Sequence, residues 1–238
     1  DAIVADNAFE PSNNIRITYD KNSENYIMNN TPENRLTTTE VNVPLSVRNI
    51  QSYQFYGFNA INRLELENTV LKILPAAFKN CTNLSSITLK PNLWFIGSGA
   101  FANSGLNELS IPSTVTTMEE GVCKGASKLT RVVIPNSIES ILEYSFYGCD
   151  KLNEVVIEPA VEPELGKKGK GLKYIADYAF GSDELTEITI PASVKTIGRN
   201  AFANCPNLRV INIAEYPKSH VSDLSSDSIE NAPWGAPN

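Results

Sequence analysis

The sequence is poor in the residues and segments that mark catalytic, membrane-spanning or nucleic-acid-binding proteins. Its 238 residues include one histidine, His220, and the acidic residues outnumber the basic ones, giving a net charge of -7. No run approaches the ~20 consecutive apolar residues of a membrane-spanning helix, and no signal peptide is visible at the start. Because nucleic-acid binding needs a clustered basic surface, we expect neither a nucleic-acid partner nor membrane insertion.

Motifs of common enzyme and cofactor sites are also missing. The sequence has no glycine-rich phosphate loop, no HExxH and no CxxC pair. A Ser-His-Asp or Cys-His site needs a histidine held by a rigid frame, whereas His220 lies in a polar tail. Composition alone leaves open a carboxylate pair of the glycosidase type, but the carboxylates lie mainly at positions expected to be exposed. We therefore expect no catalytic, metal or cofactor site.

The sequence does contain an internal repeat of about 23 residues. The stretches LTRVVIPNSIESILEYSFYGCDK and LTEITIPASVKTIGRNAFANCPN align without a gap. The alignment extends to eight units, which begin at Thr38, Ile61, Leu84, Leu106, Leu129, Leu152, Leu185 and Leu208. One unit cannot bury its apolar face alone, so the units are predicted to stack as a solenoid.

Apolar residues recur at fixed positions within each unit. Three and five residues after the start come pairs such as Val132 and Ile134, and Pro follows in half of the units. β-branched residues dominate, so a short strand that ends at the proline is predicted. A second apolar pair, such as Ile138 and Ile141, lies either in a looser segment or in a second short strand.

An aromatic column and a Gly/Asn column complete the unit. The run that contains the aromatic residue is predicted to form one or two helical turns, and Gly or Asn then tolerates the left-handed conformation that ends a helix. The aromatic column holds Phe55, Phe78, Phe101, Phe146, Phe180 and Phe202, with Cys123 once in that place. The Gly/Asn column holds Gly57, Asn80, Asn103, Gly125, Gly148 and Asn204.

The four cysteines fall in these interior columns. Cys81, Cys149 and Cys205 share one column but never occupy adjacent units, and Cys123 occupies the aromatic column. Since neighbouring units stack ~4.8 Å apart, cysteines two or more units apart exceed the reach of a disulfide. We interpret all four as buried free thiols, with a reactive or metal-binding cysteine as the less favoured alternative.

The pattern LxxIxIPxxVxxIxxxAFxxCxx resembles the BspA-type (Treponema pallidum-type) leucine-rich repeat, over roughly residues 38–213. The resemblance implies a right-handed α/β-type solenoid of short parallel strands and short helical turns. It also implies display on a bacterial surface or secretion, and binding to host proteins, other cells or carbohydrates. The motif residues define a core, so the resemblance carries over no functional residue.

Three parts of the chain are expected. Residues 1–37 are predicted to form an N-terminal cap, with a hairpin between NNIRITYD and ENYIMNN, because terminal repeats need a cover for their apolar ladders. Residues 38–213 form the solenoid, and residues 214–238 a C-terminal capping tail. We expect a monomer.

An insertion of about eleven residues near 159–169 interrupts the unit that starts at Leu152. Insertions in solenoids map to loops on one face, often the binding face, although a long surface loop is also tolerated without any function. The candidate ligand-binding residues of this segment are its charged side chains, which are Glu162, Glu164, Lys167, Lys168 and Lys170.

A second candidate surface is a charged column on the first strand of the units. Stacking places Arg131 between Glu108 and Glu154, and Glu40 beside Arg63. A surface ladder of ion pairs, worth ~0–1 kcal/mol per pair, explains this column without a ligand; a charged binding surface is the alternative.

The sequence therefore supports three functional hypotheses in descending order. The first is a surface or secreted recognition module that binds an extracellular protein or glycan. The second is a spacer that holds another domain away from a bacterial surface. The third, an enzyme, lacks a recognisable set of catalytic residues.

Overall fold

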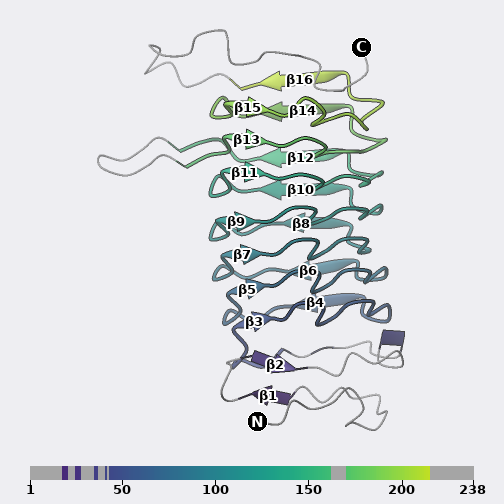
Figure 1. The fold of residues 1–238 in the computed structure, drawn as a ribbon, viewed down its shortest axis with the longest axis vertical. Coiled ribbons are helices and arrows are strands. Elements are labelled where there is room, and N and C mark those ends of the chain that lie inside the picture. The colour runs from purple at the N-terminus through teal and green to yellow at the C-terminus, as the bar shows by residue number, and fades with distance from the viewer. Residues whose placement is uncertain are drawn as a thin grey trace.

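The computed structural model describes residues 18–20, 25–27, 35–36, 41, 43–161 and 170–214. These residues form a solenoid in which six rungs contribute two short strands each, while the first and last described rungs contribute one (Figure 1). The described first strands are β4 (Arg63–Glu65), β6 (Ser86–Thr88), β8 (Glu108–Ser110), β10 (Arg131–Ile134), β12 (Glu154–Ile157), β14 (Glu187–Ile190) and β16 (Val210–Ile213). The described second strands are β3 (Asn49–Ile50), β5 (Lys72–Ile73), β7 (Phe95–Ile96), β9 (Thr117–Met118), β11 (Ser140–Ile141), β13 (Tyr174–Ile175) and β15 (Thr196–Ile197).

Strands of successive rungs pair in parallel and in register. Arg131 of β10 lies opposite Glu108 of β8 on one side and Glu154 of β12 on the other. In the second ladder, Ile73 pairs with Ile96. The repeat length therefore sets the register directly, and equivalent positions of neighbouring units face each other as the alignment predicts. The second member of this apolar pair, such as Ile141, lies in a second short strand, and the first member, such as Ile138, lies just before that strand, so each alternative left by the sequence holds for one member.

At the N-terminal end, β1 (Thr18–Asp20) and β2 (Asn25–Ile27) pair antiparallel. They lie in the segment where the sequence predicts a hairpin. Asn25 of β2 pairs in parallel with Asn49 of β3, so this hairpin extends the second-strand ladder by backbone hydrogen bonding. The proposed C-terminal cap falls outside the described residues, apart from residue 214.

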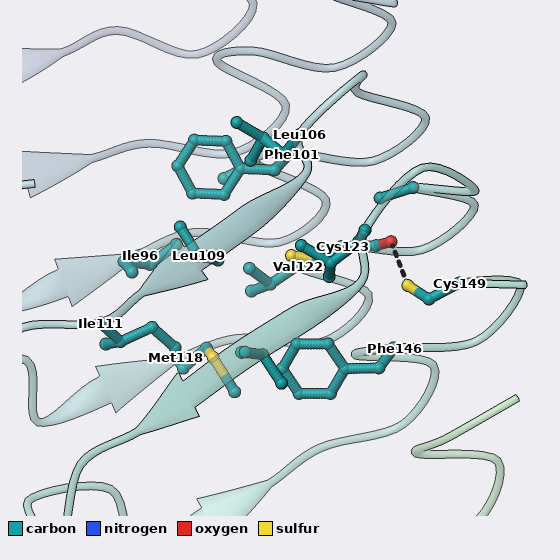
Figure 2. Packing of buried hydrophobic residues seen from close by; sticks show 14 of the residues in the cluster. Ile96, Phe101, Leu106, Leu109, Ile111, Met118, Val122, Cys123, Phe146 and Cys149 are labelled. Atoms are coloured by element: carbon teal, nitrogen blue, oxygen red, sulfur yellow. Dashed lines mark hydrogen bonds between the residues drawn. The ribbon is translucent and has the colours of Figure 1, made fainter. Parts of the chain in front are cut away.

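The core fills the space between the two ladders. The predicted apolar columns are buried along the stack, and neighbouring phenylalanines of the aromatic column stack ring on ring. The centroids of Phe55 and Phe78 lie 5.0 Å apart with an interplanar angle of 3°, and those of Phe146 and Phe180 lie 5.5 Å apart. Cys123 interrupts this ladder between Phe101 and Phe146, and Figure 2 shows it in the core beside them.

The predicted helical turns are wrong. Within the described residues, helix is confined to Arg35–Leu36. In the turn before Cys81, the N–H groups of Ala77 and Lys79 donate to carbonyls three residues earlier, at 3.3 and 3.1 Å. The N–H groups between and after them, those of Phe78 and Asn80, donate to the next rung at 2.8 Å. Because alternate amides are taken by the neighbouring rung, the i to i−4 pattern of an α-helix cannot form.

The Gly/Asn column adopts the predicted left-handed conformation at five of its six positions. The residues with positive φ are Gly57, Asn80, Asn103, Gly125 and Gly148. The prediction is wrong for Asn204, which instead forms a parallel bridge with Gly181 of the preceding rung.

A second left-handed column lies four residues earlier in the units and was not predicted. Its members are Tyr53, Ala76, Gly99, Gly121, Tyr144 and Tyr178, with φ between 55° and 62°. Two left-handed residues therefore flank the core residue in five of the described turns, those of Phe55, Phe78, Phe101, Cys123 and Phe146.

We expect Phe146→Ala to lower the free energy of unfolding by about 3–5 kcal/mol, because it empties a fully buried position between stacked rungs. Urea denaturation measures the change. The exposed Leu45 offers a control, since Leu45→Ala should change stability by less than ~0.5 kcal/mol. Equal losses in the two variants would contradict the proposed role of the aromatic ladder.

Gly125→Ala should also destabilise the fold, by more than ~1 kcal/mol. Gly125 has φ of +73°, and an added Cβ would overlap Asn103 Oδ1 of the preceding rung. Gly99→Ala is the matched comparison, because Gly99 has φ of +59° but an added Cβ there meets only the Ala102 Cβ, at 3.7 Å. The thermal midpoint of Gly125→Ala should be lower than that of Gly99→Ala. The reverse order of midpoints would contradict this account.

Candidate ligand-binding surfaces

The insertion leaves the solenoid between β12 and β13 (Figure 1). Its two ends are tied by an antiparallel bridge, in which the N–H of Val161 donates to Lys170 O at 2.9 Å and the N–H of Lys170 donates to Val161 O at 3.2 Å. Register across the insertion is kept, because Ile141 of β11 pairs with Ile175 of β13. Lys170 is exposed at the base of this stem. The other predicted site residues of the insertion, Glu162, Glu164, Lys167 and Lys168, lie outside the described residues.

The charged column on the first strands is present where it was predicted. Arg131 Nε lies 2.9 Å from Glu154 Oε1, and Glu108 lies opposite Arg131 on the other side. Elsewhere on this ladder Lys90 pairs with Glu65, and the hydrogen bond from the Lys90 ammonium lowers the pKa of the Glu65 carboxyl. These carboxylates are largely exposed and lie opposite cations, so surface ion pairs account for the column, and its role in binding stays a prediction. Glu40, predicted beside Arg63, lies outside the described residues.

Tyrosines gather on the turns that follow the second strands, and the repeat pattern gives no signal for this grouping. Tyr144 and Tyr178 of successive rungs stack with centroids 5.7 Å apart and an interplanar angle of 6°. Tyr147 meets Tyr144 edge to face at 5.6 Å. Lys124 Nζ of the preceding rung lies 4.3 Å from the Tyr144 ring centre, within cation–π range.

A similar pair lies near the N-terminal end of the solenoid. Tyr53 and Tyr56 have ring centroids 5.8 Å apart, and Arg35 lies over the Tyr56 ring at 5.6 Å. Asn80 Nδ2 donates to the Tyr56 hydroxyl at 2.8 Å, and Asn103 Nδ2 donates to Asn80 Oδ1 at 2.9 Å. An amide ladder thus runs from this tyrosine pair along the turn face.

The backbone of these tyrosines is strained. Tyr53 and Tyr144 have φ of 58° and 59°, a left-handed conformation that costs a side-chain-bearing residue about 1–2 kcal/mol relative to its usual regions. Tyr53 is 58% exposed and Tyr144 is 38% exposed, so burial in the core does not offset that cost. Strain kept at a surface position is a feature typical of functional sites.

One exposed aromatic lies beside the second strands. Trp94 is 39% exposed, and Lys72 Nζ of the preceding rung lies 4.7 Å from its ring centre. Phe95, the next residue, meets it edge to face at 5.7 Å. Tryptophan and tyrosine are the side chains most enriched in binding hot spots. The sequence offered no signal for this site beyond the presence of a tryptophan in a strand-flanking position.

The four cysteines are buried and free, as predicted. The Cys149 thiol donates to Cys123 O at 3.2 Å (Figure 2), and the Cys81 thiol donates to Phe55 O at 2.9 Å. Burial raises the pKa of Cys81 and Cys123 from 9.0 to about 12, and that of Cys205 to about 11. A thiol held neutral in this way is a poor nucleophile and a poor metal ligand.

Among the residues that the structure describes, no group of three or more His, Cys, Asp or Glu residues could hold a metal ion. No helix among those residues is long and apolar enough to cross a membrane. The described surfaces present aromatic rings, amides and charged side chains on a regular backbone.

The stacked two-strand rungs, with their apolar columns, define a leucine-rich-repeat solenoid. The sequence matches the family described as "BspA type Leucine rich repeat region (6 copies)" over residues 2–127 and 117–231. The chain therefore belongs to the BspA-type leucine-rich repeat family. Repeats of this family are typically non-catalytic.

Solved structures of bacterial proteins are similar. A leucine-rich cell surface protein from Faecalibacterium prausnitzii is 23% identical with a TM-score of 0.62, over 86% of this chain and 54% of that one. A leucine-rich repeat protein from Eubacterium ventriosum is also 23% identical, with a TM-score of 0.48, over 82% of this chain and 50% of that one. The chain thus spans about half the length of these two relatives. The likeness to the first shows the fold, and no curated protein sequence matches.

The buried thiols should make stability fall at alkaline pH. Below the unfolded thiol pKa of about 9 the thiols are neutral in both states. Between about pH 9 and 12 the unfolded chain loses protons that the folded chain keeps, so the free energy of unfolding falls by up to ~1.4 kcal/mol per pH unit for each thiol. Urea denaturation at about pH 8 and about pH 10 measures this fall. The free energy of unfolding should decrease less between the two pH values in the Cys81→Ala/Cys123→Ala variant than in the unchanged chain. An unchanged slope would contradict this linkage.

Proposed function

We propose that the chain is a non-catalytic recognition module displayed outside a bacterial cell, which binds extracellular proteins or glycans. The observation that carries the proposal is the pair of in-register parallel ladders, which hold side chains at a fixed spacing along one rigid axis. From β4 to β16, six rung spacings of ~4.8 Å make this surface roughly 29 Å long. Membership of the BspA-type family and likeness to a bacterial cell surface protein support the location.

The chemistry of the described surfaces also supports binding rather than catalysis. Carboxylates on the first-strand ladder lie beside cations or amides, as in Arg131 with Glu154 and in Asn212, whose Nδ2 donates to Glu187 Oε1 at 2.6 Å. Aromatic rings are held by their neighbours at the surface, at the tyrosine pairs and at Trp94. Such fixed aromatic and charged groups bind a partner with little loss of side-chain freedom. We propose that the chain acts as a monomer.

A second candidate function is that of a spacer. The chain spans about half the length of the Faecalibacterium prausnitzii protein, and its second-strand ladder continues across the insertion in register. A stiff rod of this kind would hold another domain at a distance from the cell surface. A spacer needs no ligand, which separates the two functions experimentally.

The test is a binding screen of the purified chain against extracellular-matrix proteins, mucins and a glycan array. Saturable binding at or below about 10 µM is expected. If nothing binds at ten times that concentration, the spacer function is favoured over the recognition function.

A matched variant would test the insertion in the same screen. Because Val161 and Lys170 form an antiparallel bridge, residues 162–169 can be replaced by Asn-Gly, which closes a two-residue hairpin turn. Binding lost in this variant would locate the ligand at the insertion, and binding retained would locate it on the repeat faces. A Glu108→Gln/Arg131→Gln/Glu154→Gln variant controls for the charged column.

A further inference from the structure

A five-residue motif occurs twice on the turn face. The sequences YQFYG at 53–57 and YSFYG at 144–148 occupy equivalent positions of two rungs. In each copy the phenylalanine is buried in the core and the glycine is left-handed, with φ of 73° and 71°. The first tyrosine is also left-handed in both copies. Two copies of one local structure therefore place an exposed tyrosine, Tyr53 or Tyr144, beside a half-buried one on the turn face.

The leading tyrosine is not needed to build the turn. The same column holds Gly99, Gly121 and Ala76 in other rungs, and these residues adopt the same left-handed backbone. Glycine does so without strain, since it lacks a Cβ. Keeping an exposed, strained tyrosine at both copies of the motif points to a task for the ring itself.

The rings are also held in place by their neighbours. At the second copy, Tyr144 lies between Lys124 of the preceding rung and Tyr178 of the next. At the first copy, Arg35 and Asn80 fix Tyr56. A partner would thus meet aromatic surfaces that are already ordered, which lowers the entropic cost of binding.

Repetition of the motif indicates the chemistry of the partner. The two copies are related by four rungs of the solenoid, roughly 19 Å along its axis. Two identical elements that are shifted along one axis suit a ligand that repeats along its own length. A linear polysaccharide has that property, whereas the folded surface of a protein does not.

The surroundings of the rings agree with a sugar ligand. Apolar C–H groups of a pyranose pack against aromatic rings, and at the second copy they would meet the exposed edge of Tyr144, because Lys124 and Tyr178 cover its faces. Amides and carboxylates that can bind sugar hydroxyls lie along the same turns, namely Asn80 and Asn103 in the amide ladder, and Glu143 and Asp177 directly before Tyr144 and Tyr178. Lys124 and Arg35 also lie at these rings, but each is engaged with a tyrosine ring, and the two carboxylates in a chain of net charge -7 disfavour a polyanionic ligand.

We infer that the two tyrosine motifs together bind a linear, non-acidic polysaccharide laid along the solenoid axis. This rests on the proposed recognition function and assigns it a site and a ligand class. Engagement of both copies by one chain raises the apparent affinity above that of either copy alone. Oligosaccharides too short to reach both copies should therefore bind more weakly than the polymer.

Tyr53→Gly and Tyr144→Gly test the site without damaging the fold, since each removes a ring and relieves a left-handed strain. Ala76→Gly is the matched control, because it makes the same backbone change in the same column with no ring to remove. The thermal midpoints of the tyrosine variants should equal or exceed that of the unchanged chain.

Binding would be measured against mannan, xylan, dextran and mixed-linkage β-glucan, with hyaluronan and dextran sulfate as polyanions. We expect at least one of the four non-acidic polymers to bind. Each single tyrosine variant should weaken that binding by about 10-fold and the double variant by about 100-fold or more. Ala76→Gly should leave it unchanged.

Several results would overturn the inference. Two concern the variants: polysaccharide binding unchanged in the double tyrosine variant, or reduced equally in Ala76→Gly. Two concern the ligand: binding to the polyanions alone, or binding to extracellular-matrix proteins or mucins without binding to any polysaccharide. In each of these cases the recognition function stands and only the site or the ligand class fails. If neither a polysaccharide nor a protein binds, the recognition function fails together with the inference.

Discussion

Backbone hydrogen bonding between successive rungs is the constraint on which the rest of the structure depends. It fixes neighbouring units about one strand spacing apart and in register, so that each position of a unit lies directly beside the same position of the next. An apolar residue that recurs in the sequence then becomes a continuous ladder in the core. The stacked rings of Phe55, Phe78 and Phe101 are the plainest consequence.

The same hydrogen bonds shape the turns. Alternate amides of each turn donate to the neighbouring rung and the others donate within the turn. In five of the described turns a left-handed residue lies on each side of the core residue. The turn is therefore a shared structure between two rungs, and its conformation depends on the neighbour as much as on its own sequence. This dependence explains why the expected helical turns do not form.

Function in such a solenoid is confined to what the regular backbone leaves outside the core. The first-strand face carries ion pairs that satisfy one another, such as Arg131 with Glu154. The turn face carries tyrosines whose backbone is strained and whose rings stay exposed. The contrast between satisfied charges and retained strain makes the turn face the stronger candidate for recognition, although the charges were easier to notice in the sequence.

The sequence by itself determined the repeat, the core columns, the parallel stacking and the buried free thiols. These follow from the spacing of apolar residues, because a 23-residue period allows only one way of burying every column. Asn204 shows where that reasoning ends, since a residue suited to a left-handed turn forms a bridge with Gly181 instead. Only the tertiary structure decided the form of the turns, the second left-handed column and the grouping of Tyr144, Tyr147 and Tyr178. The physical reason is that these features depend on hydrogen bonds and ring contacts between rungs, which the pattern within one unit does not encode.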